Sequence, residues 1–481
     1  MQYAKVVSEI EAMDGRERER LRQFVHSPYF NTHAPTARLL DYVLKELRRK
    51  RPRLGTEELT KFLAPASAPD TLSALMKLLN RFLAVEEMAE EPFVEERLLL
   101  RRSARQHRNK LLENRAKRLR RQFVGYPYRD APYHLAGYEV NRLTGDLRTE
   151  TRRKHIAEFQ HMLDHLDRYW LVEKLRHACH FSANRVVMNV HYDLHLIDEI
   201  VAFLGGDAGA KLREEEPGID CYYRIYLSIH DVDNPLHYER MGYYLGPGLD
   251  SIPPDERKDL LIFATNYCID RIKSGQNDYR RELLNLYRRA LDSGIIYTDT
   301  DEITEWDFKN IVTIGSATGE LSWTEAFIES HRERLPATVR DNVYALNKAR
   351  FLYSAGRLDE AAELLIGVRD HNVQGHLARV LLQVQIAYAQ VEDEFALNLL
   401  EAFRLYVHRN ANMTVADKRS YNNFIRLARQ LINLRLNWAY SDPAANQRRL
   451  NSLNDAVRDT KLLHGRGWLA QQSGQLQNSP V

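Results

Sequence analysis

The sequence contains few residues that interrupt helices and few cysteines. It holds 16 prolines and 22 glycines among 481 residues, so breaks between helices are widely spaced. Its three cysteines, Cys179, Cys221 and Cys268, lie far apart and follow no metal-ligand spacing. An odd, sparse set argues against a disulfide framework and is typical of a reducing compartment. No run reaches the roughly 18 apolar residues of a membrane helix, and the N-terminal segment lacks the apolar core of a signal peptide. We therefore predict a cytoplasmic protein that does not contact a membrane.

The sequence also lacks the motifs that mark common enzyme classes. It has no Walker-type phosphate loop, no strand-flanked GxGxxG, no GxSxG elbow and no CxxC pair. We therefore expect no catalytic residue, no bound metal and no cofactor, and we predict that the protein is not an enzyme.

The residues that are present favour helices throughout the chain. Hydrophobic residues make up 44% of the sequence and charged residues 28%, which is ordinary for a folded protein. Apolar stripes with helical spacing recur between breaks, and we predict an all-α fold containing an α-solenoid of degenerate tetratricopeptide-like helix pairs. The predicted parts are a helical unit at 1–92, a basic long helix and helical middle region at 93–205, helical repeats at 219–465 and a flexible tail at 466–481. The Gly-rich, charged segment 205–218 is the predicted linker.

One helix pair shows the repeat most clearly. Residues 344–368 contain two helical patterns that meet at a Gly-Arg-Leu-Asp turn, and Gly356 stands where a helix end needs a left-handed residue. Alanines recur at intervals of 35 residues, early in each expected second helix. The residues predicted to pack the repeats are Ala326, Ala349, Leu352, Gly356, Ala361, Leu365, Ala396 and Leu400. A period of 35 also occurs in RNA-reading pentatricopeptide repeats, but no polar position recurs beside the alanines, so we rank that interpretation lower.

Several short motifs resemble those of an uncharacterised bacterial family. The motifs are HSPYFN at 26–31, LSALMKLLNRFLAVEE at 72–87, LDRYWLVEKLRHAC at 166–179, WDFKNIVTIGS at 306–316, WTEAFIESHRERLP at 323–336 and YNNFIRL at 421–427. The resemblance spans the whole chain and implies an all-helical protein with degenerate tetratricopeptide-like repeats. It implies no activity.

A basic stretch is the candidate for binding anions or nucleic acid. Residues 97–129 hold twelve Lys and Arg against one acid, Glu113, on an expected single helix over residues 94–124. Such a helix can neutralise several phosphates, and three tyrosines follow that can stack on bases. The alternative is an exposed charged face that meets acidic segments of the same chain. The candidate residues are Arg101, Arg102, Arg105, Arg108, Lys110, Arg115, Lys117, Arg118 and Arg121.

Two other patterns are weaker candidates. The segments TEELTKFL and DTLSALMKLLNRFL resemble a DNA-reading helix pair, but the second is apolar nearly all round, which predicts a core helix. Histidines gather between residues 155 and 195, and the pairs His161/His165 and His191/His195 have the spacing of one helix face. Zinc needs at least three converging ligands, so we expect no metal at either pair.

These observations favour a non-catalytic protein-interaction scaffold. Its helix pairs over 219–465 are predicted to present a concave surface to an unidentified protein partner. The alternative is a nucleic-acid-binding or regulatory protein that uses the basic helix 97–121.

Overall fold

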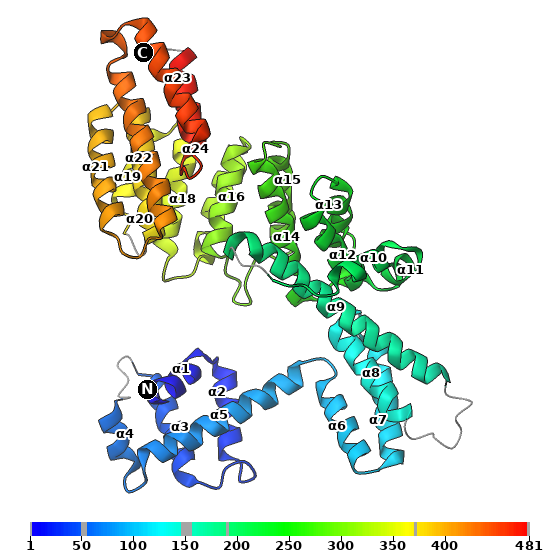
Figure 1. The fold of residues 1–481 in the computed structure, drawn as a ribbon. Coiled ribbons are helices and arrows are strands. Elements are labelled where there is room, and N and C mark those ends of the chain that lie inside the picture. Colours follow the sequence, from blue (N-terminus) through cyan, green and yellow to red (C-terminus); the bar gives the residue numbers. More distant parts are fainter. Residues whose placement is uncertain (1, 50–54, 146–155, 189–191, 370–372, 479–481) are drawn as a thin grey trace. The chain divides into compact units, whose positions relative to one another are not determined.

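The computed structural model describes residues 2–49, 55–145, 156–188, 192–369 and 373–478. Over these residues it contains 24 α-helices joined by turns and no β-strand; an isolated bridge pairs Tyr297 with Ile303 (Figure 1). The predicted all-α class is confirmed. The chain divides into two compact units, residues 1–253 and 254–481. In the part of the chain that the structure describes, no helix is long and apolar enough to cross a membrane.

The first unit begins with five helices around a small apolar core. Its helices are α1 (Gln2–Ala12), α2 (Gly15–His26), α3 (Ala34–Leu47), α4 (Thr56–Leu63) and α5 (Ala68–Glu90). The start of α2 is fixed by a capping box, in which Asp14 accepts from the backbone of Glu17 and Glu17 accepts from the backbone of Asp14. Helix α5 buries Leu72, Leu75 and Leu79 in this core, as expected for a core helix rather than a DNA-reading one.

The basic segment forms a helical hairpin, so the prediction of one long helix over residues 94–124 was wrong. Helix α6 (Val94–Arg105) and helix α7 (Asn109–Gly125) pack against each other. The chain reverses at His107, whose φ of 53° is left-handed. The Arg108 N–H donates to the carbonyl oxygen of Ser103 at 3.0 Å, which closes the turn. No glycine or proline marks this break, because His107 supplies the left-handed conformation.

The rest of the first unit is organised along one long helix. Helix α9 packs on α8 and on α12. The helices are α8 (Ala131–Gly145), α9 (Ile156–Met188), α10 (Ile197–Gly205), α11 (Asp207–Glu215), α12 (Pro217–His230) and α13 (Pro235–Gly242), followed by the short 3-10 turns η2 (Tyr243–Leu245) and η3 (Leu249–Ser251).

The segment 205–218, predicted as a linker, is instead mostly helical. Helix α11 occupies most of it and lies close to the end of α10. Gly209 is buried there, and a Cβ added to it would lie 2.3 Å from the carbonyl oxygen of Phe203. The glycine therefore permits close packing between two helices.

The second unit is a succession of helix pairs. Its helices are α14 (Pro254–Lys273), α15 (Tyr279–Asp292), α16 (Glu305–Ala317), α17 (Leu321–Ser330), α18 (Arg340–Ser354), α19 (Leu358–Ile366), α20 (Val373–Ala389), α21 (Asp393–Arg409), α22 (Val415–Leu436), α23 (Pro443–Asp459) and α24 (Arg466–Asn478), with 3-10 turns η4 (Arg332–Arg334) and η5 (Trp438–Tyr440). Helix α18 contacts α16, α17, α19 and α20, so the first helices of successive pairs touch one another.

The C-terminal residues also pack into this unit. Residues 466–478, predicted as a flexible tail, form α24, which contacts α22 and α23. Trp468 is only 8% exposed, and its indole N–H donates to the Tyr353 hydroxyl at 3.0 Å. The polar composition misled the prediction, because three apolar side chains at helical spacing, Leu469, Trp468 and Leu476, are enough to dock the helix.

The first helices of four pairs end in the same way. At Gly356 the chain adopts a φ of 77°; the Arg357 N–H donates to Leu352 O, and the Gly356 N–H donates to Tyr353 O. This is a Schellman motif, which satisfies carbonyls at the helix end. Equivalent bonds and a positive φ occur after α14, α16 and α20, at Gly275, Gly319 and Val391. Glycine at three of the four positions explains the breaks seen in the sequence.

The structure buries six of the eight residues predicted to pack the repeats and places Gly356 in a left-handed turn. Those that pack between helices are Ala349, Leu352, Ala361, Leu365, Ala396 and Leu400, each at most 1% exposed, and Gly356 forms its turn. Ala326 differs, because it is exposed. Thr324, two residues earlier, is fully buried in its place, and its hydroxyl lies where a Cβ on Gly315 of α16 would fall. The intervals of 35 residues therefore match the packing in two pairs, α18/α19 and α20/α21, and not in α16/α17.

Exchanging residue types at the shared turn should change stability in opposite directions. Val391→Gly removes a β-branched residue from a left-handed conformation, and Val391 is 63% exposed, so little packing is lost. We expect the free energy of unfolding to rise by about 1 kcal/mol, and Gly356→Ala to lower it by a similar amount. Urea unfolding of the full chain measures both. Destabilisation by Val391→Gly would contradict the assignment of strain to this turn.

Candidate functional site

Two buried carboxylates neutralise part of the basic hairpin. Arg97 and Arg101 both donate to Glu139 of α8, whose side chain is 5% exposed, and Arg118 of α7 lies 2.7 Å from Glu96 of α6. Burial alone would raise the pKa of Glu139, but hydrogen bonds from the two arginines hold it below its ordinary value. Arg101 therefore fastens α6 to α8, and Arg118 fastens α7 to α6, as in the alternative in which basic residues meet acids of the same chain.

The remaining cations of the hairpin lie on its surface. Arg102, Arg105, Arg108 and Lys110 surround the turn at His107, and all are exposed. Lys117 and Arg121 are exposed on α7, while Arg115 is half-buried. Among the residues that the structure describes, no carboxylate forms an ion pair with any of the four at the turn. The four cations around the turn are the densest exposed group of the hairpin, and we call residues 102–110 the basic tip.

Two of the three tyrosines after the basic stretch, Tyr126 and Tyr133, are engaged within the fold. Tyr133 is 8% exposed and lies in an aromatic cluster with Phe93 and Tyr126. The Tyr126 hydroxyl donates to Asp130, and the guanidinium of Arg129 covers the Tyr133 ring at 4.9 Å. Tyr133 is thus unavailable for stacking on bases, and Tyr126 is engaged in holding α7 to α8.

The predicted histidine pairs do not form metal sites in the described residues. His161 is exposed, His191 lies outside the described residues, and no group of three His, Cys, Asp or Glu side chains that could hold a metal occurs in the described chain. His165 turns inward over Gly137 of α8, and its Nδ1 lies 3.2 Å from Nδ1 of the fully buried His134.

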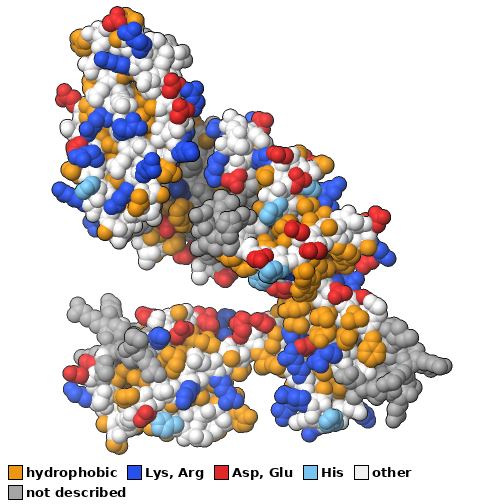
Figure 2. Space-filling view, in the orientation of Figure 1, with side chains coloured by type: hydrophobic (Ala, Val, Ile, Leu, Met, Phe, Trp, Pro, Cys, Tyr) orange, Lys and Arg blue, Asp and Glu red, His pale blue; other side chains and the backbone are white. Residues whose placement is uncertain are grey.

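An apolar groove between α9 and α10 was missed in the sequence. It has a volume of about 520 Å³ and includes Trp170, Leu196 and Phe203, which are 42%, 58% and 49% exposed. Along α9, the side chains at 159, 163, 166 and 170 form one helix face beside it, each at least 37% exposed. In Figure 2, apolar side chains gather over α8 and the N-terminal half of α9. The spacing was visible in the sequence, but only the structure shows that no helix in the described part covers this face.

Acidic residues border this groove. Asp164, Asp167 and Glu199 line it, together with Arg168. Arg168 is neutralised, because it lies 2.7 Å from the buried Glu216 and 3.1 Å from Glu215. Asp167 and Glu199 are exposed and form no ion pair within the described ranges. The groove is therefore apolar at its floor and negative at its rim.

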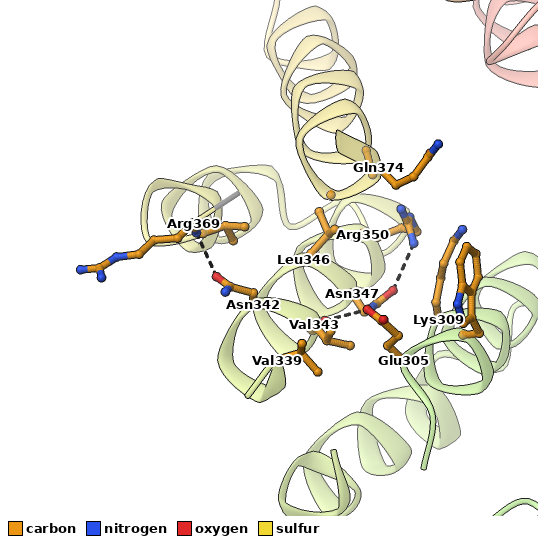
Figure 3. Close-up of a pocket in the computed structure, with 14 residues that line it drawn as sticks. Glu305, Lys309, Val339, Asn342, Val343, Leu346, Asn347, Arg350, Arg369 and Gln374 are labelled. Carbon is orange, nitrogen blue, oxygen red and sulfur yellow. Dashed lines mark hydrogen bonds between the residues drawn. The ribbon is translucent and has the colours of Figure 1, made fainter. Parts of the chain in front are cut away.

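A second pocket lies among the first helices of the pairs in the second unit. Its volume is about 200 Å³, and α16, α18, α20 and the α19–α20 connection line it (Figure 3). Its polar residues include Lys309, Asn347 and Arg350, and its walls are mostly aliphatic. Arg369 borders it, but in Figure 3 its side chain extends away from the other labelled residues.

Comparisons with known proteins identify no relative of this chain. No family model, curated protein or solved structure matches the chain. The resemblance to a bacterial helical family stays a prediction, as do the absence of enzymatic activity and the cytoplasmic location.

Acidification should destabilise the first unit through His165. Burial, followed by repulsion from His134 and Arg168, lowers the pKa of His165 from 6.5 to about 4. Between these values the unfolded chain binds a proton that the folded chain does not, so stability falls as pH drops through this window. Urea unfolding at pH 7 and pH 5 measures the loss, which should be smaller in His165→Asn. The exposed His195→Asn is the control, and an equal loss in both variants would contradict the assignment.

Proposed function

We propose that the protein is a non-catalytic interaction scaffold whose principal docking site is the α9/α10 groove. The observation that carries this proposal is the row of half-exposed apolar side chains on α9, continued by Trp170, Leu196 and Phe203 in the groove. Single exposed apolar residues are ordinary, but a contiguous apolar face with a polar rim is typical of protein-binding surfaces.

The groove suits an amphipathic helix with basic flanks. Apolar residues of such a helix at i, i+3, i+4 and i+7 would fill the floor, as in other helix-in-groove complexes. Its Lys or Arg side chains would meet Asp167 and Glu199 at the rim, where opposite charge favours encounter and fixes orientation. Trp170 is the natural anchor, since large aromatic residues in pockets contribute most to such interfaces.

The helix pairs of the second unit support the scaffold proposal independently. Repeated Schellman turns after α14, α16, α18 and α20, together with contacts between α16, α18 and α20, are what a solenoid of degenerate tetratricopeptide-like pairs requires. In this proposal the protein acts in the cytoplasm, and the pairs form a second surface for partners.

A designed peptide tests the groove directly. A labelled amphipathic Leu/Lys helix should bind the full chain, and a Leu/Glu helix of the same pattern should bind much more weakly. Trp170→Asp should weaken binding by about 2 kcal/mol, or roughly thirtyfold, in fluorescence anisotropy. Val124→Asp is the control, because Val124 is 89% exposed in the same unit and lies outside the groove. Equal binding of both peptides, or no effect of Trp170→Asp, would contradict the proposal.

A second candidate function is binding of nucleic acid by the basic tip. It is favoured by four exposed cations around His107 without an acidic partner among the described residues. These cations are too close to one hairpin turn to follow a duplex over many base pairs, so the contact would be with a few phosphates. Salt dependence with a slope of about one per phosphate neutralised is the expected signature.

Charge reversal at the basic tip tests this candidate. The variant Arg105→Glu, Arg108→Glu, Lys110→Glu should abolish retention on DNA at low salt. For the wild type, the logarithm of the association constant should fall by about 3 or more for each tenfold rise in salt concentration. Arg118→Glu is unsuitable, because it would break the ion pair with Glu96. The triple change Arg280→Glu, Arg281→Glu, Arg448→Glu in the second unit is the control of equal charge, because these arginines are exposed and have no ion pair among the described residues. Retention that survives the tip variant eliminates this function.

A further inference from the structure

The pocket between α16, α18 and α20 brings together two cations that no acid of the described residues neutralises. Arg350 of α18 and Lys309 of α16 both line it, and Figure 3 shows their nitrogen ends on the same side of the pocket. Among the described residues, neither forms an ion pair. Glu305 also lines the pocket, but it is exposed at its edge and pairs with neither cation.

The side chain of Arg350 makes few hydrogen bonds for a residue that lines a pocket. Its Nη1 donates to Asn347 Oδ1 at 3.1 Å, and this is the one hydrogen bond that its side chain makes within the described residues. A guanidinium has five N–H donors, so four of them have no partner among the described residues. Asn347 is 3% exposed and is itself held by Val343 O at 2.8 Å, so the Arg350 side chain is anchored in place.

The electrostatics of the two cations agree with this geometry. Burial lowers the pKa of Arg350, and burial followed by repulsion from Arg350 lowers the pKa of Lys309. The Lys309 ammonium lies 5.1 Å from the centre of the Trp306 ring, which stabilises it in part. Both cations are half-buried, which makes their charge costlier than in water, and no acid among the described residues offsets it.

We propose that this pocket binds a small organic anion, whose carboxylate or phosphate head contacts Arg350 and Lys309 and whose apolar body lies against the aliphatic wall. The wall consists of Val339, Val343, Leu346, Val368 and Ala378. The planar fork of Arg350 matches two oxygens of either head group, and Lys309 adds a point charge. At about 200 Å³ the pocket is smaller than those of about 300–1,000 Å³ that hold drug-sized ligands, which favours a short acid.

This site is independent of the proposed docking groove. It belongs to the second unit, whereas the α9/α10 groove belongs to the first. If anion binding fails, peptide docking in the α9/α10 groove can still be tested, and the reverse is also true.

Calorimetric titration of the full chain with four simple compounds tests the proposal. Hexanoate or hexyl phosphate should bind, and whichever binds more tightly identifies the head group. Hexanamide, which lacks the charge, and acetate, which lacks the apolar body, should each bind at least about tenfold more weakly than hexanoate. Failure of both hexanoate and hexyl phosphate to bind at millimolar concentration, or equal binding of hexanamide, overturns the proposal.

Two pocket variants and one control locate the binding. Arg350→Met and Lys309→Met should each weaken binding of the tighter anion by about tenfold or more. Arg448→Met is the control, because Arg448 is exposed on α23 and lies outside the pocket. Arg350→Met should also fold, since the cation it removes has no acidic partner among the described residues and Asn347 loses a single donor. If that variant fails to fold, Lys309→Met decides alone, and unchanged affinity in it overturns the proposal.

Discussion

The second unit depends on one backbone constraint, which is the reversal of the chain after the first helix of each pair. A helix leaves its last carbonyls without partners, and a left-handed residue allows two backbone N–H groups to return to them. After α18 these bonds are made by Gly356 and Arg357, and equivalent bonds follow α14, α16 and α20. The turn holds each second helix against its first, which leaves the first helices free to touch one another across successive pairs. The pocket exists because α16, α18 and α20 meet in this way.

Much of the fold was predictable, because helix-forming periodicity and turn residues act locally. Gly356 forms a left-handed turn and Ala361 and Leu365 are buried, because a glycine at a helix end and a small residue between helices act in the same way in any helix pair. The errors arose where tertiary contacts override the local pattern. No glycine or proline marks the chain reversal at His107. Ala326 is exposed because α17 packs Thr324, and not Ala326, against α16.

The candidate sites were less predictable than the fold, since they depend on which charges the fold neutralises. The sequence contains many arginines, and their number alone does not show which are available. Arg101 and Arg118 stood out in the densest basic run, yet they face buried acids. Arg350 is an inconspicuous residue in a helix pair that was chosen for its packing pattern. The pocket around Arg350 forms only when the fold brings α16 and α20 beside α18.

The left-handed turn at Val391 makes the strain differ from one helix pair to the next. A β-branched residue in this conformation holds its turn under strain, whereas glycine at the other three turns does not. Local opening of a protein begins where the least free energy opposes it. At the junction between α20 and α21, strain of about 1 kcal/mol favours opening, but both helices belong to one apolar core with α22, α23 and α24. That shared core, and not the turn itself, therefore keeps the junction closed.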